Sequence, residues 1–188
     1  MAEHSERMTR PIRRVVTGTR ADGKSAVLSD SDNPYRFHRG HGSTSVFTEI
    51  WAFDTSPAPI GGDKDGGDRP LSHSPPPDGA HFRVIQSTKE DNMKVDQTAI
   101  DQQFGAMNEG GLSERVKSTR HWNMHRTRTV DYGIVVFGSR LHILPDGDFV
   151  MRKGDVVIQL GHVHSWDNPE DNITMFDMIG GEYPFDDQ

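Results

Sequence analysis

The feature that most constrains the fold is a succession of short runs with β-strand character, with glycine, proline or aspartate in the turns between many of them. Beyond His121 these runs follow one another closely, at 124–129, 132–137, 140–144, 148–152, 155–160 and 173–179. Val- and Ile-rich runs between turn signals at this spacing are typical of a β-sandwich or small barrel. The 19 glycines and 11 prolines support a turn-rich β protein over a helical bundle.

The N-terminal half continues this pattern with longer interruptions. Runs 13–19 and 25–29 flank Asp22-Gly23, which predicts a hairpin. Further strands are expected at 45–53 and 81–87, and 30–42 is expected to be a loop. The sequence therefore predicts an all-β fold whose strands are spread along nearly the whole chain.

Two segments interrupt the strands. Residues 55–80 are dominated by glycine, proline and aspartate, so this long segment is predicted to be a loop without a core of its own. Residues 93–107 place Met93, Ile100, Phe104 and Met107 on one helical face, which predicts one amphipathic helix. With a polar N-terminal arm at 1–12, the length of 188 residues fits a single domain at 13–188.

Composition excludes several classes of function. The chain has no cysteine, which excludes disulfides, thiolate catalysis and cysteine-based metal sites. Its net charge of -7 argues against a nucleic-acid partner. No stretch has the roughly 18 apolar residues that a membrane span needs, and residues 1–14 lack the apolar core of a secretory signal. We therefore expect a cytoplasmic protein whose chemistry uses imidazole and carboxylate groups.

Two motifs carry that chemistry. The first is HRTRTVDYGIVVFG at 125–138, and the second is GDVVIQLGHVHSWDN at 154–168. Together they resemble the two signature motifs of the cupin superfamily, in particular its small single-domain members. The resemblance implies a double-stranded β-helix, or jelly-roll barrel, with the 93–107 helix as an addition. It also places His125 and Asp131 of the first motif, and His164 of the second, at the metal-ligand positions.

The sequence departs from the family pattern at three positions. Thr127 stands where the first motif usually has a second histidine, Asp131 replaces glutamate, and Gln159 replaces a common proline. Two imidazoles and one carboxylate are still compatible with a divalent ion such as Fe, Mn, Ni or Zn. We therefore predict a metal site formed by His125, Asp131 and His164.

Neighbouring residues are assigned by the alternation of side chains along a strand. His162 shares a face with His164 and His121 shares one with His125, so both are candidate catalytic imidazoles, and His162 could replace the missing ligand. Thr127, Trp166 and Asn123 are candidates for the wall of a substrate pocket. The remaining histidines of the loops and their borders are expected at the surface: His38, His41, His73 and His81.

The leading functional hypothesis is a metal-dependent enzyme with lyase-type chemistry, namely decarboxylation, dehydration or isomerisation. Its substrate would be a small organic molecule with a carboxylate, carbonyl or phenolic group. One alternative is a non-haem Fe(II) dioxygenase, since two histidines and a carboxylate leave open positions for dioxygen. The other is a non-catalytic cupin that binds a small ligand, which Thr127 favours. A homodimer is expected, because the edges of the N-terminal hairpin need cover.

Overall fold

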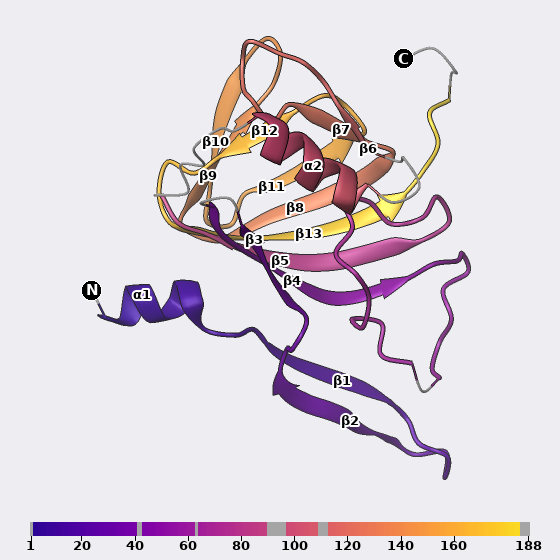
Figure 1. Cartoon of the computed structure of the whole chain (residues 1–188). Coiled ribbons are helices and arrows are strands. Elements are labelled where there is room, and N and C mark those ends of the chain that lie inside the picture. The colour runs from indigo at the N-terminus through magenta and orange to yellow at the C-terminus, as the bar shows by residue number, and fades with distance from the viewer. Residues whose placement is uncertain (1, 41–42, 63, 90–96, 109–112, 185–188) are drawn as a thin grey trace.

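Antiparallel strands build most of the structure, a computed structural model that describes residues 2–40, 43–62, 64–89, 97–108 and 113–184 (Figure 1). The elements in chain order are α1 (Ala2–Thr9), β1 (Arg13–Thr19), β2 (Ser25–Asp32), β3 (Arg36–Gly40), β4 (Ser43–Phe53), β5 (Ala80–Ser87), α2 (Gln97–Met107), β6 (Ser113–Arg115), β7 (His125–Thr127), β8 (Thr129–Phe137), β9 (Ser139–Ile143), β10 (Asp148–Arg152), β11 (Val156–Leu160), β12 (Ser165–Asp167) and β13 (Asn172–Gly180). The predicted all-β fold is confirmed.

The largest sheet has six strands in the order β11-β8-β13-β5-β4-β3. Its central strand β13 pairs with β5 on one side and with β8 on the other, so segments far apart in the sequence become neighbours. Phe176 of β13, for example, lies opposite Arg83 of β5 and Gly133 of β8. This crossing order means that the barrel cannot form until both halves of the chain are present.

A second sheet of three strands, in the order β10-β9-β12, packs against the first. Trp166 of β12 lies 5.5 Å from Phe176 of β13, measured between ring centroids. Phe176 belongs to a core cluster with Ile85 and Met178, and Trp166 and Phe47 pack against this cluster. Aromatic and aliphatic side chains therefore fill one part of the space between the two sheets, and the remainder forms the pocket described below.

The N-terminal region is more ordered than the sequence indicates. The polar arm contains the helix α1, whose Met8 is buried against Val84 and Ile173. The expected hairpin is present as β1 and β2, and Figure 1 shows it extending away from the barrel. The expectation of a loop throughout 30–42 was wrong, because β2 continues to Asp32 and β3 pairs with β4.

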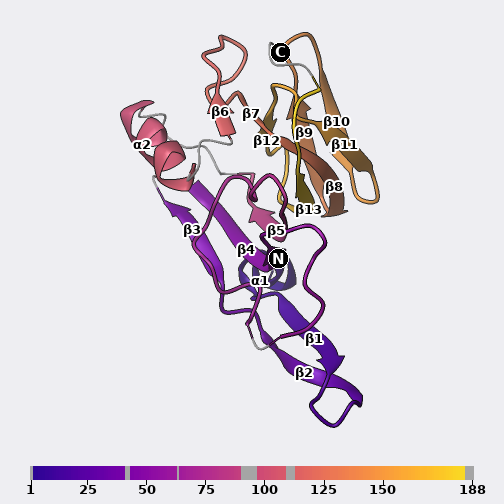
Figure 2. The same cartoon turned by 90° about the vertical axis from the view of Figure 1, so that its right-hand side faces the viewer.

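The helix α2 and the strand β6 lie at one end of the barrel (Figure 2), and residues 72–74 of the long 55–80 segment contact both of them there. α2 occupies the C-terminal part of the predicted helix and buries Phe104 and Met107, whereas Met93 lies outside the described residues. The backbone N–H of His73, in the 55–80 segment, donates to the carbonyl of Met107 at 2.8 Å. Ser74 and Ser113 join the same segment to β6 through their hydroxyls at 2.7 Å. α2, β6 and the 55–80 segment therefore form one cover over this end of the barrel.

Neither helix among the described residues is long and apolar enough to cross a membrane.

Candidate functional site

The site begins where β7 meets the segment that leads into β12. His125 and His164 form an antiparallel bridge there, and each backbone N–H donates to the other residue's carbonyl at 2.9 Å. Their rings lie 4.6 Å apart between centroids. The barrel thus brings His125 of the first sequence motif and His164 of the second side by side, although 39 positions separate them in the sequence.

Backbone hydrogen bonds orient both rings. Nδ1 of His125 lies 2.8 Å from the carbonyl oxygen of Asn123, and Nδ1 of His164 lies 3.0 Å from that of His162. Since a carbonyl oxygen only accepts, each Nδ1 must carry the proton and donate it. Each Nε2 therefore keeps its lone pair, which is the arrangement that second-sphere hydrogen bonds impose on metal-binding histidines.

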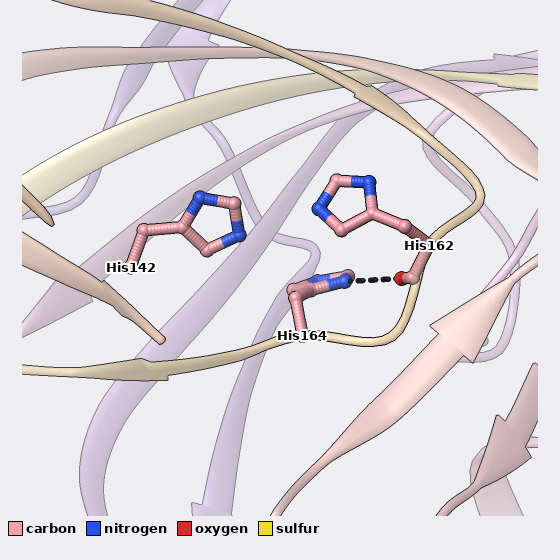
Figure 3. A group of neighbouring side chains, drawn as sticks. All are labelled: His142, His162 and His164. Atoms are coloured by element: carbon pink, nitrogen blue, oxygen red, sulfur yellow. Dashed lines mark hydrogen bonds between the residues drawn. The ribbon is translucent and has the colours of Figure 1, made fainter. Parts of the chain in front are cut away.

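His164 also belongs to a cluster of three imidazoles with His142 and His162 (Figure 3). One ligand atom from each residue lies within 4.8 Å of those of the other two. His142 comes from β9, whereas His162 and His164 come from the turn between β11 and β12. Trp166 stacks on the His142 ring at 4.1 Å with an angle of 10° between the planes, which fixes that ring's orientation.

All the imidazoles of this region are held in the neutral form near neutral pH. Burial lowers the pKa of His142 to about 4 and that of His125 to about 4. Burial, reinforced by the neighbouring His125, lowers the pKa of His164 well below its usual range, and burial also lowers the pKa of His162. Only the neutral form has a lone pair to offer, so the cluster is ready to bind a cation at pH 7 without first losing protons.

Asp131 of β8 contributes a buried carboxylate. Its exposed fraction is 3%, and its Oδ1 has no hydrogen-bond partner in the protein. Burial raises the pKa of Asp131 to about 6. A buried carboxylate oxygen without a partner is costly, so this group is expected to meet a cation, a proton or a ligand donor.

A pocket of about 800 Å³, part of it open to solvent, occupies the barrel interior next to these groups. Its polar walls include His125, His164 and Asp131, and its apolar walls include Phe47 and Trp166. Met107 of α2 and His73 of the 55–80 segment also line it, so the cover described above closes part of the mouth.

The structure brings most of the predicted site residues to this pocket. Six of them line it: Asn123, His125, Thr127, Asp131, His164 and Trp166. His162 does not line the pocket but joins the three-imidazole cluster behind it. His121 is also outside the lining and pairs its Nδ1 with the hydroxyl of Ser165 at 2.6 Å. Among the described residues, the group with closely spaced ligand atoms contains His164 but neither His125 nor Asp131.

Sequence reasoning missed three histidines. His142 lies outside both motifs, although it alternates with Arg140 on a predicted strand, and that alternation is a usable signal for a shared inward face. His73 and His81 were expected at the surface, which was wrong: His73 lines the pocket, and His81 is 3% exposed with its Nε2 3.0 Å from the sulfur of Met178. His38 is exposed as expected, and His41 lies outside the described residues.

Comparison with known proteins supports the resemblance seen in the motifs. No family model matches the sequence. A cupin-domain-containing oxidoreductase of Hypocrea virens, virC, is 43% identical over 53 residues, or 28% of this chain and 27% of that protein. The fold is that of a cupin. A second cupin-domain-containing oxidoreductase, srdD of Neurospora crassa, matches to the same extent.

The cupin resemblance is local in sequence, since the chain spans about a quarter of the length of these curated relatives. An RmlC-like cupin from Shewanella frigidimarina aligns over 78% of this chain and 84% of its own, with a TM-score of 0.40 and 14% identity. The cupin domain of Cnp3 from Schizosaccharomyces pombe aligns over 92% of this chain and 98% of its own, with a TM-score of 0.42 and 11% identity.

Proposed function

We propose that the protein is a metal-dependent cupin enzyme that acts on a small organic molecule inside the barrel. The observation that carries this proposal is the group of three neutral imidazoles, His142, His162 and His164, whose ligand atoms lie within 4.8 Å of one another beside the pocket. His164 belongs both to this group and to the pocket wall, so an ion bound there would adjoin the space for a substrate.

The donor set fits a divalent ion of the first transition row. Imidazole nitrogen suits Fe, Ni and Zn, and three protein ligands leave positions for water or substrate. The three imidazoles whose ligand atoms lie within 4.8 Å of one another are the residues that would hold the ion. When bound, such an ion supplies Lewis acidity toward a substrate oxygen, or a redox centre if it is iron.

The chain's own residues supply the rest of the chemistry. Asp131 presents an unpartnered carboxylate oxygen in the pocket and can hold a proton taken from a substrate carbon or hydroxyl. The Nε2 of His125 keeps a lone pair and can accept a proton or support the ion. Phe47, Trp166 and the cover from α2 exclude water from the reacting molecule.

Two reaction types follow from this set of groups. Lyase-type chemistry is supported by the buried carboxylate, which can move a proton to or from a substrate carbon. Oxidation with dioxygen is supported by the imidazole ligands, and it agrees with the naming of the two relatives as oxidoreductases. The two types differ in their need for oxygen.

Metal content tests the proposal directly. We expect the protein, purified without chelators or reconstituted with Fe(II) under argon, to hold about one ion per chain. His164→Ala should weaken binding at least about a hundredfold, because removing residues that only support ligands already costs 10–100-fold. His38→Ala, at an exposed histidine of β3, is the matched control and should bind as the wild type does.

Two further variants identify the ligand set. His142→Ala should weaken binding as much as His164→Ala if the three-imidazole cluster holds the ion. His125→Ala should do so if the ion is held at the motif positions with Asp131. A wild type that binds no ion, or an ion unaffected by His164→Ala, would contradict the proposal.

Incubation with a panel of small carboxylates and phenols, followed by mass spectrometry, separates the reaction types. A lyase gives the same product in air and under argon, whereas an oxygenase gives product only in air. Binding of these compounds without any product in either atmosphere would favour a ligand-binding cupin and would contradict the enzyme.

A further inference from the structure

The charge of the pocket is opposite to that of the chain. The protein has a net charge of -7, yet three arginines, Arg39, Arg83 and Arg140, line the pocket. Among the described lining residues, Asp131 is the one carboxylate. Cationic groups gathered in a cavity of an acidic protein raise the local concentration of anions. The positive charge of the pocket therefore favours a negatively charged ligand.

Arg83 of β5 is occupied by the protein itself. Its Nη2 lies 2.8 Å from Oε1 of Glu49 on the neighbouring strand β4, and both side chains are almost fully buried. The same nitrogen donates to the carbonyl of Ser72 at 2.6 Å. The charge of Arg83 is therefore matched by a buried carboxylate, and its position is fixed by β4 and the 55–80 segment.

Arg140 of β9 packs against two aromatic rings of the pocket wall. It is 7% exposed, and its guanidinium carbon lies 5.0 Å from the ring centroid of Trp166 and 5.6 Å from that of Phe176. Two aromatic rings stabilise the guanidinium by cation–π interaction and hold it in place within the pocket wall. A guanidinium is also the side chain best suited to pair with a carboxylate, because its planar N–H groups match the two oxygens.

The residues that line the pocket around Arg140 indicate the polarity of the rest of the ligand. Phe47, Ile85, Trp166 and Phe176 give the pocket apolar and aromatic surfaces on the side of the core cluster. These surfaces suit a flat or apolar body of a small molecule.

We propose that Arg140 binds the carboxylate of the substrate, and that the substrate is a small organic carboxylate with an aromatic or apolar body. The proposal rests on the proposed function in taking this pocket as the substrate site. Arg140 lies outside the three-imidazole cluster, so its contribution does not depend on a bound ion.

Calorimetric titration of the full chain with benzoate and with benzamide tests this proposal. The two probes share a ring and a size but differ in charge. We expect benzoate to bind at least about tenfold more tightly than benzamide, because only benzoate completes a charge-assisted pair with the guanidinium. The preference should remain after a chelator has removed divalent ions.

Substitutions then assign the preference to Arg140. Arg140→Gln should reduce benzoate affinity about tenfold and leave benzamide affinity unchanged, since it removes the charge and keeps a polar side chain. Arg140→Lys keeps the charge but loses the planar pair, so it should fall between Arg140→Gln and the wild type. Arg152→Gln, at an exposed arginine of β10, is the control and should behave as the wild type does.

The wild-type comparison keeps the proposal testable even if Arg140→Gln does not fold. Equal binding of benzoate and benzamide, or binding of neither up to about 10 mM, would overturn the proposal. A benzoate preference as strong as that of the wild type in a folded Arg140→Gln or Arg140→Lys protein would also overturn it. An Arg140-dependent preference in a protein that binds no metal would uphold the carboxylate site while the metal-dependent function fails.

Discussion

The inner and outer faces of the barrel have opposite polarity. On β8 and β11 the side chains that point inward include Thr129, Asp131 and Gln159, all at most 4% exposed. The side chains that point outward on the same two strands are mostly apolar and at least 37% exposed: Tyr132, Ile134, Val136, Val156, Ile158 and Leu160. A water-soluble sheet usually has the reverse arrangement.

Folding stability alone therefore does not explain the polarity of either face of β8 and β11. Burying polar groups costs free energy unless they are paired, so the polar inner face agrees with the ligand-binding pocket proposed above. The outer residues form one contiguous surface, because Val156 lies opposite Ile134 and Ile158 lies opposite Tyr132. A contiguous apolar surface on a soluble protein is the usual mark of an interaction site.

The largest effect on stability is expected from breaking the buried ion pair between Glu49 and Arg83. Arg83→Met leaves Glu49 buried without its partner, which should lower the free energy of unfolding by about 3–5 kcal/mol. The double variant Glu49→Leu/Arg83→Met should recover most of this loss, because it removes both charges. Urea unfolding measures the change.

The matched control lies on the exposed hairpin, where Arg13 pairs with Asp30 at 2.7 Å. Arg13→Met should leave the urea midpoint close to that of the wild type, because exposed ion pairs contribute little. If the double variant at Glu49 and Arg83 is as unstable as Arg83→Met alone, uncompensated charge is not the cause.

The outer face should determine the assembly. We propose a homodimer in which the β8–β11 surface of one copy covers that of another, since β11 is an edge strand of its sheet and its outward residues are apolar. Ile158→Glu should convert a dimer at micromolar concentration into a monomer, as measured by light scattering. Its metal content should not change, because the inner face is intact.

The β1–β2 hairpin is the alternative surface for the dimer contact, because its Val27 is 51% exposed. Dissociation by Val27→Glu and not by Ile158→Glu would place the contact on the hairpin instead. A wild type that is monomeric at these concentrations would contradict the dimer.

The smallest effect concerns a carboxylate outside the barrel. Asp65 of the long segment pairs with Arg14 of β1 at 2.7 Å, and this hydrogen bond lowers the pKa of Asp65. A lowered folded-state pKa stabilises the protein above the unfolded value of about 3.9, and the stabilisation is lost as the pH falls through the lower, folded value. Asp65→Asn should therefore lower the thermal midpoint slightly at pH 7 and should make no difference near pH 2. An equal loss at both pH values would exclude the ion pair as the cause.

The strand pattern and the two motifs could be recognised from the sequence because they depend on local alternation and turn residues. The hairpin around Asp22-Gly23 and the strands on either side of Gly138 were predicted in this way and are confirmed. β3 was missed because its polar sequence, RFHRG, resembles a loop. Its strand conformation comes from pairing with β4, which is a tertiary effect.

The site residues that belong to the two motifs were predicted from the sequence, whereas those brought to the site by tertiary packing were missed. His125 and His164 were found from motif spacing, and the barrel places their rings together. His142 reaches His162 and His164 only because β9 pairs with β12, which no local pattern reports. His73 reaches the pocket because a loop without periodicity folds back onto α2.

The cover over the pocket mouth also bears on how such a protein changes in evolution. His73 and Met107 line the pocket, but neither belongs to a strand of the barrel. Substitutions at these two positions therefore change the pocket wall without changing a residue of the strand pairing or of the imidazole cluster. A lineage with this architecture can acquire a new ligand preference by replacing its cover, while the barrel and its buried charges are inherited unchanged.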